Sequence, residues 1–369
     1  MKFKVDKKEF IEAIGISARA ISVKQNMPIL SGIYINAYSN GVEFQATDYE
    51  LGFIVRIEAD VEEAGEVILS GKYLTEISRK LPGDTVEFSY IESEKTAHIS
   101  SDKSNYRLLS IDGTFPKIDR VDSSVSISIK DGEFNNMIKR TTFAAATDEI
   151  RPVFTGCFFD INENTLTMVA TNTHRLALNK MTVDSTGNNI RSIIPAKALN
   201  ELSRSLKEDE PTDIVISYAN NQLGFAFRNI YMVTRLIEGE FPDYRRVIPT
   251  EHKTTAVVGR EALSSAVDRV SLISRYHEFH MINFKIENNF IHILSLNSEI
   301  GKAEEDVAAE IEGDELSISF NVMYIADVLK TMDGDKIKFS LNGELSSVKV
   351  EDTENPNFIY IVTPVRNQM

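Results

Sequence analysis

The sequence repeats one arrangement of apolar residues three times, at a spacing of about 125 residues. Each copy opens with apolar residues at steps of three and four, the spacing that puts side chains on one face of an α-helix. This first helix is predicted around the triplets Phe10-Ala13-Ile14, Phe134-Met137-Ile138 and Leu263-Ala266-Val267. A second helix is predicted around Leu74-Ile77-Leu81, Leu199-Leu202-Leu206 and Ile325-Val328-Met332.

Strand-like segments lie between the two helices of each copy. In the first copy, Ile33-Tyr34-Ile35 and Val42-Glu43-Phe44 flank the turn dipeptide Asn40-Gly41, which favours a β-hairpin. Equivalent hairpins are predicted within 157–169 and 282–294.

The repeat predicts an α+β protein of three similar domains, in which helices pack on antiparallel sheets. Asp6 and Asp131 directly precede the first helix of the first two copies and are predicted to be its N-caps. The predicted domains are residues 1–122, 123–251 and 252–369.

The composition indicates a cytoplasmic protein. Cys157 is the only cysteine, which excludes an intrachain disulfide and is typical of a reducing compartment. Because it lies in an apolar strand segment, we expect a buried, unreactive thiol. The first residues lack the apolar core of a secretory signal, and no apolar run approaches the roughly 18 residues of a membrane span.

The charge alone argues against a nucleic-acid partner. Asp and Glu number 55 against 40 Lys and Arg, a net charge of −15, whereas polyanion binding usually leaves a basic footprint. On the second helix, however, Lys72 and Arg79 lie opposite the apolar stripe, Lys197 and Arg204 repeat this placement, and the third copy keeps Lys330. A solvated helix face is the alternative interpretation.

The sequence gives little support to catalysis. It contains no phosphate-binding loop, no dinucleotide-binding motif and no nucleophile elbow. His277 and His280 have metal-ligand spacing but no further ligand nearby, so surface histidines are expected. We therefore predict a protein that is not an enzyme and has neither metal nor cofactor. A hydrolase that uses Asp148 or Glu149 is the remaining catalytic alternative.

Three segments combine apolar, aromatic and arginine side chains. They are Thr171-Asn172-Thr173-His174-Arg175-Leu176, Phe241-Pro242-Asp243-Tyr244-Arg245-Arg246 and the terminal strand Ile359-Tyr360-Ile361-Val362-Thr363-Pro364-Val365-Arg366. This combination is typical of peptide-binding hot spots, although a polar turn and an interdomain linker would also explain the first two.

At these segments the sequence closely resembles the bacterial sliding clamps, the β subunits of the replicative DNA polymerase III holoenzyme. The resemblance covers the whole chain and is most specific at Val169-Ala170-Thr171, His174-Arg175-Leu176 and residues 239–247. It implies three similar domains, a head-to-tail dimer that forms a closed six-domain ring, helices around the central hole and sheets outside. It also accounts for the acidic charge, because a ring that holds DNA topologically needs only weak, sequence-independent phosphate contacts.

The resemblance implies the site residues. The residues implied to face double-stranded DNA are Lys24, Lys72, Arg79, Lys103, Lys197 and Arg204. A pocket for short linear peptides of polymerase, clamp loader and repair proteins would comprise Arg151, Phe154, Thr171, His174, Arg175, Leu176, Pro242, Arg246, Val247, Ser347, Val362, Pro364 and Val365. Contacts in the homodimer would include Tyr106, Leu108, Leu272 and Ile273.

Some positions depart from the family pattern. Asn172-Thr173 stands where many relatives have Asp-Gly, so the turn beside the pocket is expected to have a different shape. Thr363 stands where Met is common, Asp148 puts a negative charge on a loop that approaches DNA in relatives, and 367–369 extend past the usual end. The alternative to a clamp is an intracellular peptide-binding adaptor of three modules without a DNA role.

Overall fold

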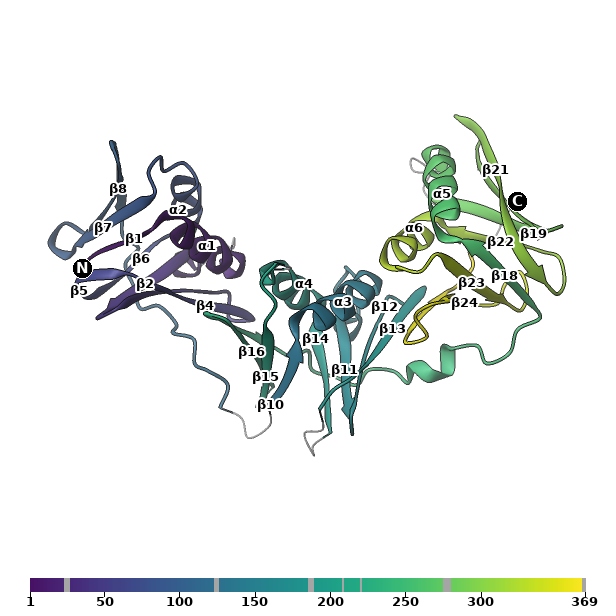
Figure 1. Cartoon of the computed structure of the whole chain (residues 1–369), viewed down its shortest axis with the longest axis horizontal. Coiled ribbons are helices and arrows are strands. Elements are labelled where there is room, and N and C mark those ends of the chain that lie inside the picture. The colour runs from purple at the N-terminus through teal and green to yellow at the C-terminus, as the bar shows by residue number, and fades with distance from the viewer. Residues whose placement is uncertain are drawn as a thin grey trace. The chain divides into compact units, whose positions relative to one another are not determined.

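A computed structural model of the chain describes residues 1–22, 27–122, 126–184, 189–207, 209–219, 221–274 and 280–366 (Figure 1). The chain divides into two compact units, which are described separately. Unit one comprises residues 1–132 and 201–236, and unit two comprises 133–200 and 237–369.

Unit one contains two antiparallel sheets. The five-stranded sheet has the order β5 (Asp60–Glu63), β1 (Lys2–Asp6), β7 (Thr85–Ile91), β8 (Thr96–Ser101) and β9 (Ser104–Leu109). The eight-stranded sheet has the order β10 (Ser126–Lys130), β15 (Asp213–Ala219), β16 (Gln222–Phe227), β17 (Ile230–Arg235), β4 (Leu51–Glu58), β3 (Gly41–Thr47), β2 (Gly32–Tyr38) and β6 (Gly65–Ser70). The predicted hairpin at Asn40-Gly41 is confirmed, since it joins β2 to β3.

Unit two is built on one antiparallel sheet of twelve strands. Its order is β14 (Ile190–Pro195), β11 (Gly156–Asn162), β12 (Thr165–Thr171), β13 (Arg175–Thr182), β25 (Phe358–Val362), β24 (Val348–Asp352), β23 (Lys336–Leu341), β18 (Thr254–Gly259), β21 (Gly301–Glu312), β20 (Phe290–Asn297), β19 (Met281–Glu287) and β22 (Leu316–Asn321). The two other predicted hairpins are confirmed as β11–β12 and β19–β20.

Each predicted helix is present. The helices are α1 (Lys7–Ser17), α2 (Gly71–Ser78), α3 (Asp131–Thr141), α4 (Ala196–Ser205), α5 (Arg260–Ser274) and α6 (Val322–Thr331). In Figure 1, α1 lies beside α2 and α5 beside α6, and both pairs are in contact. Short 3₁₀ turns lie at Ala18–Ala20, Pro28–Ser31, Glu92–Glu94, Thr142–Ala144, Pro152–Phe154 and Tyr244–Val247. In the part of the chain that is described, no helix has the length and apolar character to cross a membrane.

The apolar face of each first helix faces the core, as its spacing predicts. Phe10, Phe134 and Leu263, which begin the three triplets, are all fully buried. The N-cap prediction is confirmed for α1, because the Asp6 carboxylate accepts hydrogen bonds from the amides of Lys8 (2.7 Å) and Glu9 (3.1 Å).

The second helices are shorter than predicted. Helix α2 ends at Ser78, so that Arg79 is its C-cap and Leu81 lies beyond it. Pro82 follows Leu81, and the residue before a proline is disfavoured in helical conformation. Leu81 nevertheless remains buried, as does Met332 at the C-cap of α6. Of the second-helix triplets, Ile77 and Leu206 are only half-buried, so the spacing predicted most of the buried side chains but not where the helices end.

The sheets extend from one repeat copy into the next. In unit one, β4 of the first copy pairs with β17 of the second; in unit two, β13 of the second pairs with β25 of the third. The second predicted domain is consequently shared between the two compact units. The predicted boundary at residue 122 adjoins 123–125, which lie outside the described residues.

Candidate peptide-binding site

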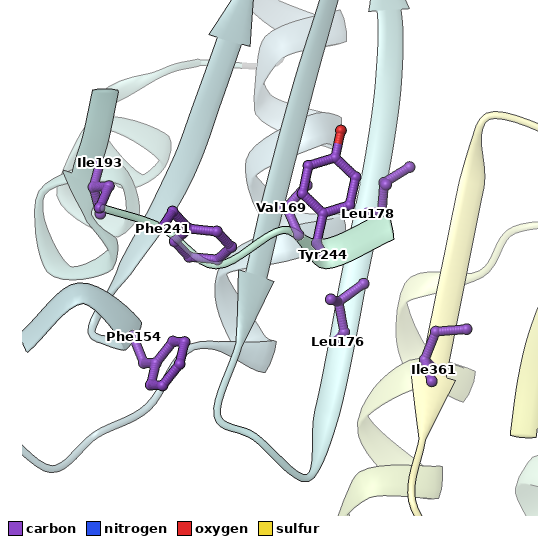
Figure 2. Packing of buried hydrophobic residues seen from close by; sticks show 8 residues of the cluster. All are labelled: Phe154, Val169, Leu176, Leu178, Ile193, Phe241, Tyr244 and Ile361. Carbon is purple, nitrogen blue, oxygen red and sulfur yellow. The ribbon is translucent and has the colours of Figure 1, made fainter. Parts of the chain in front are cut away.

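A cavity of about 250 Å³ in unit two lies over the paired strands β13 and β25. Leu176 of β13 stands opposite Ile361 of β25, and Figure 2 shows both among the buried apolar side chains of this region. The lining residues are Phe154, Thr171, Thr173, His174, Arg175, Leu176, Phe241, Pro242, Asp243, Tyr244, Val247, Ser347, Ile361 and Thr363. Two larger hollows in unit one, of about 690 and 410 Å³, are lined mostly by charged and polar groups and are less suited to an apolar ligand.

Aromatic side chains of the connector after β17 form one wall of the cavity. The ring of Phe241 stacks on Phe158, with 5.2 Å between centroids, and meets the edge of Phe154 at 6.2 Å (Figure 2 labels Phe154, Phe241 and Tyr244). Tyr244 begins a 3₁₀ turn whose N-cap is Asp243 and lies 6.2 Å from Phe158. Ring contacts of this kind fix the aromatic groups before any ligand arrives.

The turn between β12 and β13 forms the rim. The side-chain oxygen of Asn172 accepts hydrogen bonds from the amides of His174 and Arg175, both at 3.1 Å. The Thr171 hydroxyl donates to the carbonyl of Arg175 at 2.7 Å. Thr173 has φ +76°, a left-handed conformation that β-branched residues rarely adopt. The turn is therefore held by side-chain hydrogen bonds in a conformation that glycine would adopt without strain.

The tail after β25 is tied to the same turn. The backbone amide and the hydroxyl of Thr363 both donate to the carbonyl oxygen of His174, each at 2.9 Å. Thr363 thus joins the two chain segments that border the cavity.

The guanidinium group of Arg175 is directed toward α6. It forms an ion pair with Asp327 at 2.7 Å and donates to the carbonyl of Phe143. It also lies 4.5 Å from the ring centroid of Tyr324 and 5.4 Å from that of Phe143. With its side chain 10% exposed, Arg175 contributes to the cavity wall but its charge is engaged elsewhere.

Eight of the residues implied by the family resemblance line the cavity. They are Phe154, Thr171, His174, Arg175, Leu176, Pro242, Val247 and Ser347. Arg151 and Arg246 lie beside it: the guanidinium of Arg151 is 6.0 Å from the ring centroid of Phe154, and Arg246 pairs with Asp243 at 3.2 Å.

The remaining three implied pocket residues do not line the cavity. Val362 is fully buried opposite Arg175, and Ile361 takes its place in the wall because adjacent residues of a strand point to opposite faces. Pro364 and Val365 follow β25, and the amide of Val365 donates to the carbonyl of Ser319 at 2.8 Å. The family resemblance implied Val362, whereas the observed register places Ile361 opposite Leu176 and in the cavity wall.

Six lining residues were absent from the implied set: Thr173, Phe241, Asp243, Tyr244, Ile361 and Thr363. All six lie within the three segments that combine apolar, aromatic and arginine side chains. The combination of apolar, aromatic and arginine side chains in these segments therefore indicated these six residues, although the family resemblance did not name them.

The described cations among those implied to face DNA are exposed. Lys72 lies on α2, Arg79 at its C-cap, and Lys103 in the turn between β8 and β9. On α4, Lys197 and Arg204 are exposed, and Arg204 pairs with Glu201 at 2.7 Å. Lys24 lies outside the described residues.

The residues implied for the dimer lie on two separate elements. Tyr106 and Leu108 are half-buried on β9, the last strand of its sheet, and the adjacent Leu109 is 76% exposed. Leu272 on α5 is 58% exposed and Ile273 is half-buried.

The candidates for catalysis are poorly placed. Cys157 is fully buried, as predicted, and burial raises the pKa of its thiol to about 12. Asp148 and Glu149 are exposed, and Asp148 accepts a hydrogen bond from the amide of Ile150 at 3.2 Å. Within the described ranges, no group of three or more His, Cys, Asp or Glu residues could hold a metal ion.

Three repeats of helices on antiparallel sheets, with an apolar cavity over the strands that join the last two, define a modular binding protein. Family models of the DNA polymerase III beta subunit match the whole of this arrangement: the N-terminal domain at 1–119, the central domain at 128–243 and the C-terminal domain at 245–366. The chain is 33% identical to the beta sliding clamp of Staphylococcus epidermidis over 379 aligned positions, covering 99% of both proteins.

Solved structures agree with this assignment. The DNA polymerase sliding clamp of Bacillus subtilis matches with a TM-score of 0.93 and 31% identity, covering 100% of this chain and 99% of that one. A Pseudomonas aeruginosa sliding clamp bound to griselimycin matches with a TM-score of 0.92 and 27% identity over 100% of both chains. The chain belongs to the DNA polymerase III beta subunit family, the bacterial sliding clamps. Its fold is the three-domain clamp fold, and its function is that of a DNA clamp in replication.

Proposed function

We propose that this clamp encircles duplex DNA as a head-to-tail homodimer and holds polymerase, clamp loader and repair proteins through short peptides bound in the cavity over β13 and β25. The clamp acts without catalysis or cofactor, in the cytoplasm, with domains at 1–122, 123–251 and 252–369. The observation that carries the proposal is an apolar, aromatic-walled cavity on a chain of the clamp family.

The cavity suits apolar anchors of an extended peptide. It has a volume of about 250 Å³, and its floor is aliphatic at Leu176 and Ile361. Aromatic walls and a polar rim are the usual composition of a binding hot spot, in which a few anchors provide most of the free energy of binding.

The exposed cations suit weak contacts with DNA phosphates. A closed ring retains DNA without tight binding, and each phosphate contact adds about one unit of salt dependence. The net charge of −15 keeps the rest of the surface unattractive to DNA. Electrostatic attraction to DNA would come from exposed cations such as Lys72, Arg79, Lys103, Lys197 and Arg204.

A second copy of the chain is the proposed partner of β9 and α5. The outer edge of β9 has unpaired backbone groups among the described strands, and such an edge is a template for pairing with another chain. The exposed leucines Leu109 and Leu272 would be covered in the dimer.

Scattering and DNA retention test the proposal. Two chains of 41.5 kDa make 83 kDa, so small-angle X-ray scattering should give a hollow particle of that mass; a compact 41.5 kDa particle at all concentrations would contradict the ring. Replacing Lys72, Arg79, Lys197 and Arg204 by Glu should abolish retention on circular DNA after loading. The control reverses four exposed strand lysines, Lys2, Lys4, Lys180 and Lys336, and makes the same change in net charge. Equal retention by both variants would remove the four cations from the DNA interface, and a wild-type chain that is not retained at all would favour a peptide-binding adaptor without a DNA role.

A further inference from the structure

The cavity over β13 and β25 has walls from two repeat copies. Leu176 belongs to the central copy, whereas Ile361 and Thr363 belong to the C-terminal copy. The spacing between the walls therefore depends on the contacts that join these two copies within unit two.

The ion pair of Arg175 with Asp327 is one of these contacts. Arg175 follows the turn at the rim of the cavity, and Asp327 lies on α6 of the C-terminal copy. Their side chains are 10% and 30% exposed, so that solvent screens the pair only partly. Asp327 itself does not line the cavity.

Further contacts hold the Arg175 side chain on the α6 side. Its guanidinium group lies between the rings of Phe143 and Tyr324. The Tyr360 hydroxyl, from β25, donates to the carbonyl of Tyr324 at 2.9 Å, and the Asn172 amide of the rim turn reaches the Tyr324 hydroxyl at 3.4 Å. The rim turn, α6 and β25 are thus joined through one cluster.

A related ion pair occurs where the first two copies meet, although its arginine lies at a different position of its copy, in the 3₁₀ turn after α1. The second helices of the central and C-terminal copies are related by a shift of 126 residues (325 − 199), which relates Glu201 to Asp327 (201 + 126 = 327). In unit one, Glu201 lies 3.9 Å from the guanidinium of Arg19, a residue of the preceding copy. An acid at this helix position therefore receives an arginine from the preceding copy at both junctions.

We propose that Asp327 and Arg175 are a positioning pair for peptide binding, which holds the rim turn of the central copy against α6 so that Leu176 and Ile361 stay at the separation that a ligand requires. The charged groups of the pair do not contact the peptide; they act by holding the rim turn in place. This inference rests on the proposed peptide-binding function of the cavity.

The loss of Asp327 would affect the cavity in a specific way. A buried guanidinium without its carboxylate is destabilised, and it moves toward water when a path exists. Because Arg175 already forms part of the cavity wall, the cavity is the adjacent accessible space. Removing the carboxylate is therefore expected both to loosen the rim turn and to admit a charge into the apolar site.

The test compares two isosteric variants at the equivalent helix positions, Asp327→Asn and Glu201→Gln. The probe is a fluorescein-labelled peptide selected from a random library on the wild-type chain, whose binding is weakened by Leu176→Ala. Asp327→Asn should weaken binding by roughly 3- to 30-fold, the range expected for residues that act through others. Glu201→Gln should bind the peptide as the wild type does. Urea unfolding of both variants measures how much stability each has lost.

Unchanged peptide affinity in Asp327→Asn, or an equal loss in Glu201→Gln, would overturn the positioning role. Asp327→Glu keeps the charge but displaces it by one methylene, and an affinity between those of the wild type and Asp327→Asn is expected. If Asp327→Asn does not fold, Asp327→Glu provides the test. A peptide affinity of Asp327→Glu equal to that of the wild type would then overturn the positioning role. If the library yields no peptide that depends on Leu176, the proposed function fails, and this outcome is distinct from either result above.

Discussion

Replacing Leu176 by Ala should separate peptide binding from stability. Leu176 is 4% exposed and belongs to the apolar cluster that contains Phe154, Tyr244 and Ile361. Leu→Ala changes in protein cores cost about 2–5 kcal/mol in free energy of unfolding, and the cost rises with the volume of the cavity that is left. Because one side of Leu176 already borders an open cavity, a cost near 2 kcal/mol is expected.

The expected loss of affinity follows from the same contact. Full burial of a leucine side chain contributes about 1.5–3 kcal/mol. A ligand covers only the side of Leu176 that faces the cavity, so about half of this, ~1.1 kcal/mol, is available to binding, which corresponds to roughly sixfold in the dissociation constant. Fluorescence anisotropy with peptides selected on the wild-type chain alone, before any comparison with Leu176→Ala, measures the change, and urea unfolding measures the stability of the variant.

Leu178→Ala is the matched control. Leu178 lies two residues further along β13, on the same face, is 2% exposed and packs in the same cluster, but it does not line the cavity. Its replacement should cost about 3 kcal/mol in stability, because no open space adjoins it, and leave the peptide affinity unchanged. Equal weakening of binding in both variants, or a dissociation constant for Leu176→Ala equal to that of the wild type, would refute the assignment of the cavity as the binding site.

Further expectations concern stability, the buried thiol and DNA. Thr173→Gly should raise the free energy of unfolding by about 1 kcal/mol in urea titrations, because it relieves a left-handed β-branched residue; a loss would show that the turn is unstrained. Since the pKa of Cys157 is raised to about 12, its thiol stays protonated at pH 8 and should react with a thiol reagent only after unfolding; rapid labelling of the folded chain would contradict its burial. Lys72→Ala and Arg79→Ala should each lower the slope of log affinity for DNA against log salt by about one, and an unchanged slope would remove that residue from the interface.

Local periodicity accounts for what the sequence predicts well. The helical triplets are sequence-local patterns, and Phe10, Phe134 and Leu263 are buried as predicted. The hairpins follow from turn residues such as Asn40-Gly41 between short apolar runs. Helix ends are harder to predict from the sequence, because they depend on capping and on the residues that follow. Helix α2 ends three residues before Leu81, and Leu81 precedes a proline.

Long-range pairing accounts for what the sequence does not predict. Nothing in the apolar pattern of β4 or β13 indicates that each pairs with a strand of the next copy, since any exposed strand edge could accept a partner. The cavity exists only because of the second of these pairings. The resemblance to a family therefore indicated a pocket at this place, while the choice between Ile361 and Val362 required the observed register.

The direction of the Arg175 side chain likewise could not be predicted from the sequence. An arginine beside an apolar strand suggests a contact for a ligand. The sequence His174-Arg175-Leu176, however, does not indicate in which direction the guanidinium group points. Its actual partners, Asp327 and Tyr324, lie about 150 residues away along the chain (327 − 175 = 152). Only the folded structure shows that this charge is satisfied by α6.

The two junctions between repeat copies differ in the side chains that cover their paired strands. In the first junction, Gly52 pairs with Val233 at the place where Leu176 pairs with Ile361 in the second. Ile118 fills the space above Gly52, where a Cβ atom would lie 2.8 Å from its terminal carbon.

The connector segments that cover the two junctions are held by different contacts, a hydrogen bond in the first and ring packing in the second. In the first, the amide of Val121 donates to the Tyr231 hydroxyl at 2.7 Å and fixes the connector over the sheet. In the second, Tyr244 occupies the position equivalent to Ile118 (118 + 126 = 244) and packs beside Phe158. Leu176 in the second junction stands where the first has Gly52, and Leu176 and Tyr244 both line the cavity. The connector thus covers equivalent strand pairs differently: Ile118 packs on Gly52 in the first junction, whereas Phe241 and Tyr244 border a cavity in the second.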